Sequence, residues 1–317
     1  MSKPKLTIVA GPTAVGKTDY AINLAKSCDG EIISLDSVQV YKGLDIGSAK
    51  PSIEQRKIVP HYMIDEVEPS VNLNVKDFKD LATKYIEDIL SRGKLPILVG
   101  GSGFYIDAVL FDTEFLYEDD NESAKVRKEL ETDLETKGID YLYDELKKVD
   151  EKALSYIPKE NVRRVIRAIE FYRLHGIPIS THNEQERNKE CKYDYTYNVL
   201  CMDRDKLYQR INLRVDEMIK NGLLLEVKTL INKGYDQSLN SMNSIGYKEL
   251  YSFCKERDEI KNINSLDCDS RKELDGIVEE IKMHSRNYAK RQMTWFRSKK
   301  NIKKFFIFYW QNSISLL

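Results

Sequence analysis

The chain has little of what a metal centre, a disulfide scaffold or a membrane anchor requires. Its 317 residues include only four histidines and five cysteines, an odd number with no C-x-x-C pair. A structural zinc site and a disulfide framework are therefore not expected, and the thiols are typical of a reduced, cytoplasmic protein. No apolar run has the length of a membrane span, and no secretion signal is expected at the N-terminus. With 41% hydrophobic and 32% charged residues, the composition is that of a globular protein with a large core.

Against these absences stands one specific motif, which fits G-x-x-x-x-G-K-[ST] and reads Gly11-Pro12-Thr13-Ala14-Val15-Gly16-Lys17-Thr18. An apolar run suited to a buried strand precedes it, and apolar residues at helical spacing follow it. A strand, a glycine-rich turn and a helix start surround an anion with backbone N–H groups and the positive end of a helix dipole. All eight residues are therefore expected to bind a diphosphate or triphosphate. Lys17 adds a mobile cation, and the Thr18 hydroxyl is a ligand for phosphate-bound Mg²⁺.

A carboxylate is missing where ATPases and GTPases normally carry one. Their second signature is an apolar strand that ends in Asp or Glu, which holds Mg²⁺ and orients a water. The best such strand here, 95–99, is followed by Gly100-Gly101-Ser102-Gly103. This disfavours a hydrolase or a motor, although small kinases also lack that acid.

The carboxylate that stands out instead is Asp36, which follows the predicted strand 31–35. Parallel strands end at the same sheet edge, so Asp36 is expected beside the phosphate loop. A carboxylate next to a bound diphosphate is electrostatically unfavourable unless metal binding or catalysis requires it. Asp36 is therefore a candidate ligand of Mg²⁺ through water, or a base for an incoming nucleophile. A simple turn cap is the alternative interpretation.

The alternation of short apolar runs and helical stretches predicts an α/β fold, a P-loop NTPase-like doubly wound parallel sheet with a helical insertion domain. Strands are expected at 6–10, 31–35, 62–64, 95–99, 198–202 and 305–310. Helices are expected at 19–28, 75–91, 205–221, 223–233, from 245 and at 272–299.

The insertion is recognised by a change of pattern between about 115 and 195. Strand-like runs vanish there, and charged amphipathic helices are expected at 124–137, 139–148 and 161–175. The predicted organisation is a first part of the core at 1–115, the helical insertion domain at 116–195, and a second part of the core at 196–317 with a basic C-terminal helix.

The net charge of −1 conceals an uneven distribution. Residues 112–151 contain 15 acidic and 6 basic side chains, whereas residues 281–317 contain 9 basic and no acidic ones. Such asymmetry favours an acidic partner for the C-terminal part, although solvated helix faces would explain it equally well.

Several ordered segments resemble the tRNA dimethylallyltransferases, also called tRNA isopentenyltransferases, of the IPP transferase family. Besides the P-loop, they are Asp36–Pro51, Pro60–Asp65, Gly100–Tyr105, Arg163–Glu170, Arg210–Met218, Ile245–Glu249 and Lys290–Arg297. Departures are small: Ser102 replaces the commoner Thr, Phe104 replaces Leu, and Arg163 replaces Gln. The C-terminal zinc finger of eukaryotic members is not found, which implies a bacterial-type member.

The resemblance implies transfer of the dimethylallyl group from dimethylallyl diphosphate to N6 of adenine 37 in tRNA, with Mg²⁺ as cofactor and no ATP split. The implied catalytic residues are Asp36 as base, Thr13 at the leaving oxygen, and Lys17 and Arg214 on the diphosphate. The implied tRNA contacts are Asp36, Ser37, Val38, Gln39, Ser102, Arg163, Arg164, Arg167, Lys290, Arg291 and Arg297. The chain is expected to be a cytoplasmic monomer whose partners are tRNA and the prenyl diphosphate.

Three alternatives remain at this point. The chain would act as a small-molecule kinase that uses the P-loop for ATP, as a prenyltransferase of free AMP or ADP, or as a P-loop RNA-binding protein without catalysis. The basic C-terminal part and the insertion favour tRNA over a free nucleotide, and the set Thr13, Lys17, Asp36 and Arg214 disfavours a pure binder.

Overall fold

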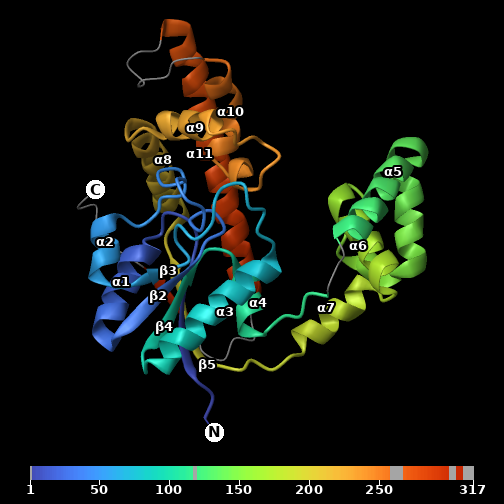
Figure 1. Cartoon of the computed structure of the whole chain (residues 1–317), viewed down its shortest axis with the longest axis horizontal. Helices are drawn as coiled ribbons and strands as arrows, with labels where there is room; N and C mark the ends of the chain where they lie inside the picture. The colour runs from blue at the N-terminus through green and yellow to red at the C-terminus, as the bar shows by residue number, and fades with distance from the viewer. Residues whose placement is uncertain (1, 117–119, 258–266, 300–304, 310–317) are drawn as a thin grey trace. The chain divides into compact units, whose positions relative to one another are not determined.

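The computed structural model of the chain describes residues 2–116, 120–257, 267–299 and 305–309. They form two compact units, one of residues 1–110 with 192–317 and one of residues 111–191. The larger unit carries the sheet and the phosphate loop, and the smaller unit is helical (Figure 1).

The sheet of the larger unit has six strands in the order β3-β2-β4-β1-β5-β6, and every neighbouring pair is parallel. The prediction of a doubly wound parallel sheet is therefore confirmed. Strand β5 begins four residues earlier than predicted, and Trp310 of the last predicted strand lies outside the described residues. The strands are β1 (Lys5–Ala10), β2 (Gly30–Leu35), β3 (His61–Tyr62), β4 (Leu95–Gly100), β5 (Asp194–Cys201) and β6 (Phe305–Tyr309).

The helices of the larger unit follow the predicted periodicity where they are long, and α3 has the predicted bounds. Two short helices, α2 and α4, were not predicted, because each has only one or two turns and little amphipathic pattern. The helices are α1 (Lys17–Cys28), α2 (Ile53–Ile58), α3 (Val75–Ser91), α4 (Gly103–Leu110), α8 (Arg204–Lys220), α9 (Leu223–Asn232), α10 (Tyr247–Lys255) and α11 (Cys268–Ser298). A 3-10 turn, η2 (Ser241–Asn243), precedes α10.

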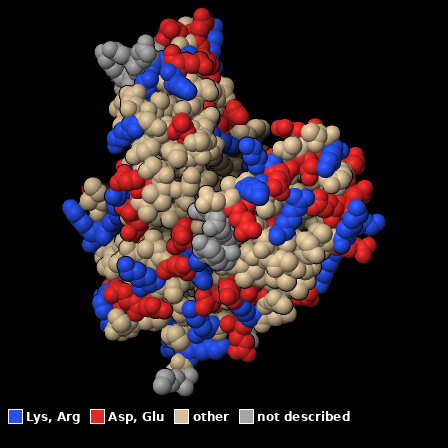
Figure 2. Space-filling model, turned by 45° about the vertical axis from the view of Figure 1, so that its right-hand side comes forward, with Lys and Arg blue, Asp and Glu red and all other residues tan. Residues whose placement is uncertain are grey.

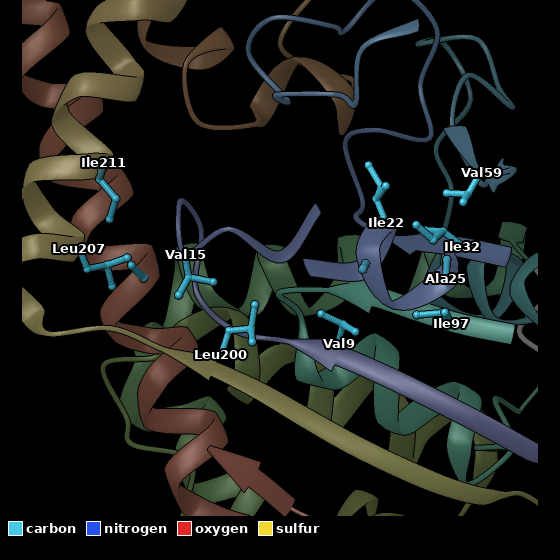
Figure 3. Close-up of a cluster of buried hydrophobic side chains, with 12 residues drawn as sticks. Val9, Val15, Ile22, Ala25, Ile32, Val59, Ile97, Leu200, Leu207 and Ile211 are labelled. Atoms are coloured by element: carbon cyan, nitrogen blue, oxygen red, sulfur yellow. The ribbon is translucent and has the colours of Figure 1, made fainter. Parts of the chain in front are cut away.

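The core lies on both faces of the sheet. The register places Val9, Ile32 and Ile97 on one face, where Ile22 and Ala25 of α1 pack against them (Figure 3). Helix α3 contacts β2 and β4 and lies across them from α1 (Figure 1). The strands are mostly apolar on both sides, with Thr7, Glu31, Ser34 and Asn198 as buried polar exceptions, so most groups able to carry chemistry lie at the strand ends.

The smaller unit consists of α5 (Asp120–Val149), η1 (Glu151–Ser155), α6 (Val162–His175) and α7 (Ile179–Arg187). Helix α5 is broken at Gly138, whose φ of 80° is not helical, so it consists of two helices in succession. Leucines of α5 pack against Val165 and Ile169 of α6. Helix α7 was not predicted, since its polar sequence has little apolar periodicity. The two compact units divide the chain at 110/111 and 191/192, and the domain boundaries at 115/116 and 195/196 stay a prediction.

A fully buried carboxylate, Glu170, organises one end of the smaller unit. Arg127 donates to both of its oxygens at 2.9 and 2.6 Å, and Arg167 lies 2.9 Å from Oε2. The two guanidinium groups hold the pKa of Glu170 below its usual value in spite of burial, which opposes them. A buried carboxylate of this kind is stable only when it is paired.

None of the helices in the described ranges is long and apolar enough to cross a membrane. On the face shown in Figure 2, acidic and basic side chains are intermingled rather than gathered by sign.

The centre of the sheet gives a stability prediction. Ile97 is fully buried between α1 and the neighbouring strands, whereas Ile58 on α2 is 52% exposed. Ile97→Ala should lower the free energy of unfolding by about 2–5 kcal/mol and the melting temperature by roughly 5–15 °C. Ile58→Ala is the matched control and should change stability by less than about 0.5 kcal/mol. Equal melting temperatures of the two variants would contradict this packing.

Candidate active site

The phosphate loop connects β1 to α1 at the carboxyl edge of the sheet. Ala14 and Gly16 have positive φ, 63° and 98°, so the backbone between them turns its N–H groups toward one concavity. The carbonyl of Ala14 points the other way and accepts a hydrogen bond of 3.0 Å from Arg210 Nε on α8. The loop is thus held in an anion-binding shape by a residue almost 200 positions away.

Lys17 at the start of α1 is turned into the loop. Its ammonium donates to the carbonyls of Gly11 at 3.0 Å and Pro12 at 2.8 Å. Burial and the neighbouring Arg214 lower its pKa to about 8, while Asp36 acts in the opposite direction. Burial also lowers the pKa of Arg214, opposed by Asp36, and Arg210 contributes to the lowering. The charged forms of Lys17 and Arg214 are both disfavoured in the absence of a ligand, which indicates a site that binds a negatively charged group.

Asp36 directly follows β2 and faces this positive cluster. Its Oδ1 accepts hydrogen bonds from the backbone N–H groups of Val38 at 2.9 Å and Gln39 at 3.3 Å. In the described part of the chain, no hydrogen bond to Oδ2 is present. The turn-cap interpretation is therefore correct for one oxygen only. That cap fixes the orientation of the carboxylate and leaves its second oxygen available for chemistry.

The loop after Asp36 is fixed by charged groups from far along the chain. Glu226 of α9 accepts from the N–H groups of Asp45, Ile46 and Gly47 at 3.0, 2.8 and 3.1 Å. It also accepts from the Tyr247 hydroxyl at 2.7 Å. Lys50, whose side chain is 2% exposed, pairs with Asp65 at 2.6 Å and thereby closes the other end of the loop.

A small pocket of about 40 Å³ lies between the P-loop, Asp36 and the end of β3. Its polar lining comes from Lys17, Thr18, Ser34, Asp36, Gln39 and His61. His61 Nδ1 faces the carbonyl of Val59 at 2.8 Å and is therefore the protonated nitrogen. Burial lowers the pKa of His61, so the ring is neutral near pH 7. Its buried Nε2 is an acceptor with no partner in the described structure, and a donor in the pocket would satisfy it.

The charge of Asp36 acts on two tyrosines of other elements. Burial raises the pKa of Tyr288 on α11 to about 12, and the nearby charge of Asp36 adds to this. The pKa of Tyr105 on α4 is raised in the same direction, mainly by burial and with contributions from Tyr41 and Asp36. Both phenols are therefore neutral hydrogen-bond groups beside the carboxylate.

The structure brings most of the predicted catalytic set together. The loop 11–18, Lys17, Asp36 and Arg214 share one edge of the sheet, as the pocket lining and the electrostatic interactions among these side chains show. Ser37 is exposed and Val38 and Ser102 are half-buried near this edge. Gln39 is engaged at both ends of its amide: Oε1 accepts from Ser34 at 2.9 Å, and Nε2 donates to the carbonyls of Ser48 and Ala49.

The predicted basic residues fall into the two units. Lys290, Arg291 and Arg297 are exposed on α11 of the larger unit. Arg163, Arg164 and Arg167 lie on α6 of the smaller unit, where Arg163 and Arg164 are exposed and Arg167 pairs with Glu170. Their contacts with tRNA stay predictions.

Sequence reasoning missed three residues of the site as contributors: Arg210, Gln292 and Tyr288. Arg210 lies one helical turn before Arg214, a spacing that puts both on the same face of α8 and was a usable signal. Tyr288 and Gln292 lie one helical turn apart on α11. The signal for Gln292 was that it is an uncharged polar residue within a segment of basic and aromatic residues.

The residues present fit a diphosphate-bound Mg²⁺ better than a metal held by protein alone. Among the described residues there is no group of three His, Cys, Asp or Glu side chains able to hold an ion. Mg²⁺ on a diphosphate needs only one or two protein oxygens besides phosphate and water. Thr18 and Asp36 supply such oxygens in one pocket.

Fold and site together define a P-loop, phosphate-binding protein of the doubly wound α/β class. Known proteins narrow this class. The IPP transferase family profile matches residues 39–299. A tRNA dimethylallyltransferase of Lachnoclostridium phytofermentans is 47% identical, covering 94% of this chain and 90% of that protein. One of Acetivibrio thermocellus is 45% identical, covering 96% and 90%. The chain therefore belongs to the IPP transferase family.

Solved structures support the same family assignment. The tRNA isopentenylpyrophosphate transferase of Bacillus halodurans has a TM-score of 0.64 at 41% identity, covering 96% of this chain and 90% of that one. A eukaryotic dimethylallyltransferase, described as acting on tRNA, has a TM-score of 0.74 at 28% identity, covering 92% of this chain and 70% of that one.

The lowered pKa of Lys17 predicts pH-dependent anion binding. Only the ammonium form attracts a diphosphate, so affinity should be full well below pH 8, begin to fall near pH 8 and then fall by up to about tenfold per pH unit. Calorimetric titration with dimethylallyl diphosphate between pH 6.5 and 9.5 measures this, because the phosphate protons are lost near pH 6. In Lys17→Met the affinity should be lower and independent of pH in this range. An unchanged affinity of the wild type up to pH 9.5 would contradict the assignment.

Proposed function

We propose that the chain is a tRNA dimethylallyltransferase, which transfers a dimethylallyl group from dimethylallyl diphosphate to N6 of adenine 37 in tRNA. The observation that carries this proposal is a P-loop with two half-buried cations and a fixed carboxylate, but no acid after β4. Such a site binds a diphosphate without the usual means of hydrolysing a nucleotide. The names of the relatives support the same activity.

In the proposed reaction the bond between the allylic carbon and oxygen breaks, and a bond from that carbon to N6 of adenine forms. The electron pair of the broken bond leaves with pyrophosphate. Lys17, Arg214 and the loop N–H groups stabilise this developing negative charge, and Thr13 lies in the same loop to meet the leaving oxygen. When bound, Mg²⁺ adds further charge neutralisation, with Thr18 as its protein ligand.

Asp36 takes the proton that N6 must lose. An exocyclic amine of adenine is a weak nucleophile and needs a base as it attacks. Oδ1 is held by two backbone N–H groups, which leaves Oδ2 as the acceptor. The cations Lys17 and Arg214 keep this carboxylate compatible with a neighbouring diphosphate.

The acceptor base reaches this site from the side of α11. Adenine 37 has to leave the anticodon stack, as in other enzymes that modify a base. Lys290, Arg291 and Arg297 are exposed and suit contact with the phosphates of the anticodon loop. Trp295 of the same helix packs against Gly103. We further propose that tRNA contacts Ser37, Val38, Gln39, Ser102, Arg163, Arg164 and Arg167, and that the active species is a monomer.

One assay tests the proposal against its alternatives. The chain is incubated with radiolabelled dimethylallyl diphosphate and either unmodified tRNA, AMP or ADP, and separately with labelled ATP and candidate acceptors. We expect label in tRNA alone. Label in AMP would identify a free-nucleotide prenyltransferase, transfer from ATP would identify a kinase, and no transfer would leave RNA binding without catalysis.

Two substitutions of Asp36 distinguish its role as a turn cap from its role as a base. Asp36→Asn keeps Oδ1 for the turn, so it should retain stability and bind tRNA within a few-fold of wild type. Its single-turnover rate should fall by about 10²–10⁴, because the amide cannot accept the proton. Asp36→Ala should be as slow and also less stable, since the cap is lost. If Asp36 were chiefly a Mg²⁺ ligand, a magnesium titration would largely restore the rate of both variants.

The basic face of α11 is tested by its salt dependence. Replacing Lys290, Arg291 and Arg297 by Ala should weaken tRNA binding and reduce the slope of log K against log salt by about 0.7–0.9 for each lost phosphate contact. Affinity for dimethylallyl diphosphate should stay within twofold. An unaltered slope in filter binding would show that tRNA lies elsewhere.

A further inference from the structure

Helix α11 does more than display basic side chains, because it is seated against the two turns that form the active site. The turn after β4 contains Gly101 and Gly103, where a methyl group would meet α11. A Cβ on Gly101 would lie 2.1 Å from Gln292 Nε2, and one on Gly103 would lie 2.0 Å from the Trp295 ring. Glycine at both positions lets the helix approach the backbone of this turn.

Gln292 connects the two turns through its side-chain amide. Its Oε1 accepts the backbone N–H of Thr13 in the P-loop at 2.9 Å. Its Nε2 donates to the carbonyl of Gly101 at 3.1 Å. Gln292 is only 7% exposed, so its own amide would be left buried and unsatisfied if these two bonds were lost. The amide of Gln292 therefore accepts from one backbone N–H and donates to one backbone carbonyl. Neither Glu nor Leu can make both hydrogen bonds near neutral pH.

The bond between Gln292 and Thr13 is significant because Thr13 is the residue proposed to donate a hydrogen bond to the leaving oxygen. The N–H of Thr13 is directed to Gln292 rather than to the concavity of the loop, and this fixes the peptide from which the Thr13 side chain projects. The amide of Gln292 also lies near the Tyr288 phenol, where it offsets part of the rise in the pKa of that group. Gln292 thus connects the P-loop to the turn after β4 and lies beside the Tyr288 phenol.

We infer that Gln292 is a positioning residue for prenyl transfer: it holds Thr13 in place for the leaving oxygen and links that placement to the helix that binds tRNA. The inference rests on the proposed function. Gln292 itself touches neither substrate. Its neighbours along the helix, Lys290 and Arg291, are exposed, so one helix carries the tRNA contacts outside and the positioning contact inside.

The first test uses Gln292→Leu, with Thr294→Ala as the matched control. Thr294 lies two residues further along α11, is exposed, and its hydroxyl bonds only to the carbonyl of Lys290 in the described structure. Gln292→Leu should lower the single-turnover rate at saturating substrates by about 10–100-fold, the usual effect of a small misplacement of reacting groups. Its affinity for tRNA should stay within threefold, and Thr294→Ala should match wild type in both. A rate within twofold of wild type would overturn the inference.

The second test uses pH with Gln292→Glu. The charged carboxylate accepts from Thr13 but opposes the Gly101 carbonyl, whereas the protonated acid donates to Gly101 and restores both bonds. The rate of this variant, divided by that of wild type at each pH, should rise as pH falls from 8 to 5.5. Division by the wild-type rate removes the titration of Asp36. The same ratio for Gln292→Leu should be flat, and a flat ratio for the Glu variant would contradict the directional bridge.

Hydrogen exchange measures the bond between Gln292 and the Thr13 amide without requiring prenyl transfer. The Thr13 amide should exchange at least about tenfold faster in Gln292→Leu than in wild type, while amides of β5 keep their protection and show that the fold persists. Equal Thr13 exchange in the two proteins would overturn the bridge whatever the assay of transfer shows. Failure of the wild type to prenylate tRNA would instead contradict the proposed function and leave this measurement standing.

Discussion

Half-buried positive charge at the carboxyl edge of the sheet is the constraint on which the site depends. Arg214 is close enough to Lys17 to lower the pKa of its ammonium, and Asp36 is the carboxylate that opposes the loss of charge on both side chains. The protein satisfies the Lys17 ammonium with its own carbonyls at Gly11 and Pro12. A diphosphate relieves the same repulsion more completely, since its charge is larger and mobile. The same cations would therefore attract a diphosphate and, in the proposed reaction, stabilise the negative charge that develops on the departing pyrophosphate.

Asp36 shows how one side chain serves the fold and the chemistry. Capping a turn with Oδ1 removes the rotational freedom of the carboxylate, so Oδ2 is presented in one direction. The loop that follows this turn is held by Glu226, which accepts from the Ile46 N–H and from the Tyr247 hydroxyl, and by the ion pair of Lys50 with Asp65. A base that is oriented before its substrate arrives loses less entropy in the transition state than a free one. The distant network around the loop is in this sense part of the active site.

The sequence was informative wherever the chemistry is local. Residues 11–18 form a continuous motif, and Asp36 follows a strand, so adjacency along the chain and the rule for parallel sheets suffice to bring them together. Gln292 and Arg210 could not be predicted in the same way, because their partners at Thr13 and Ala14 are far away in the chain. Helices α2, α4 and α7 escaped prediction for a different reason: short or polar helices are stabilised by caps and packing that periodicity does not record.

The contacts explain why widely spaced segments of the sequence carry one function. The segment 36–51 meets 245–249 where Tyr247 and Glu226 bind its loop, and the P-loop meets 210–218 through Arg210. The turn at 100–105 meets 290–297 through Gln292 and Trp295, at distances that only glycine permits. Each pair joins a turn at a strand end to a helix from the C-terminal part of the chain. The sheet supplies the edge, but the helices α8 and α11 decide the shape of its turns. A change in either helix would consequently alter chemistry at residues that it neither contains nor adjoins in sequence.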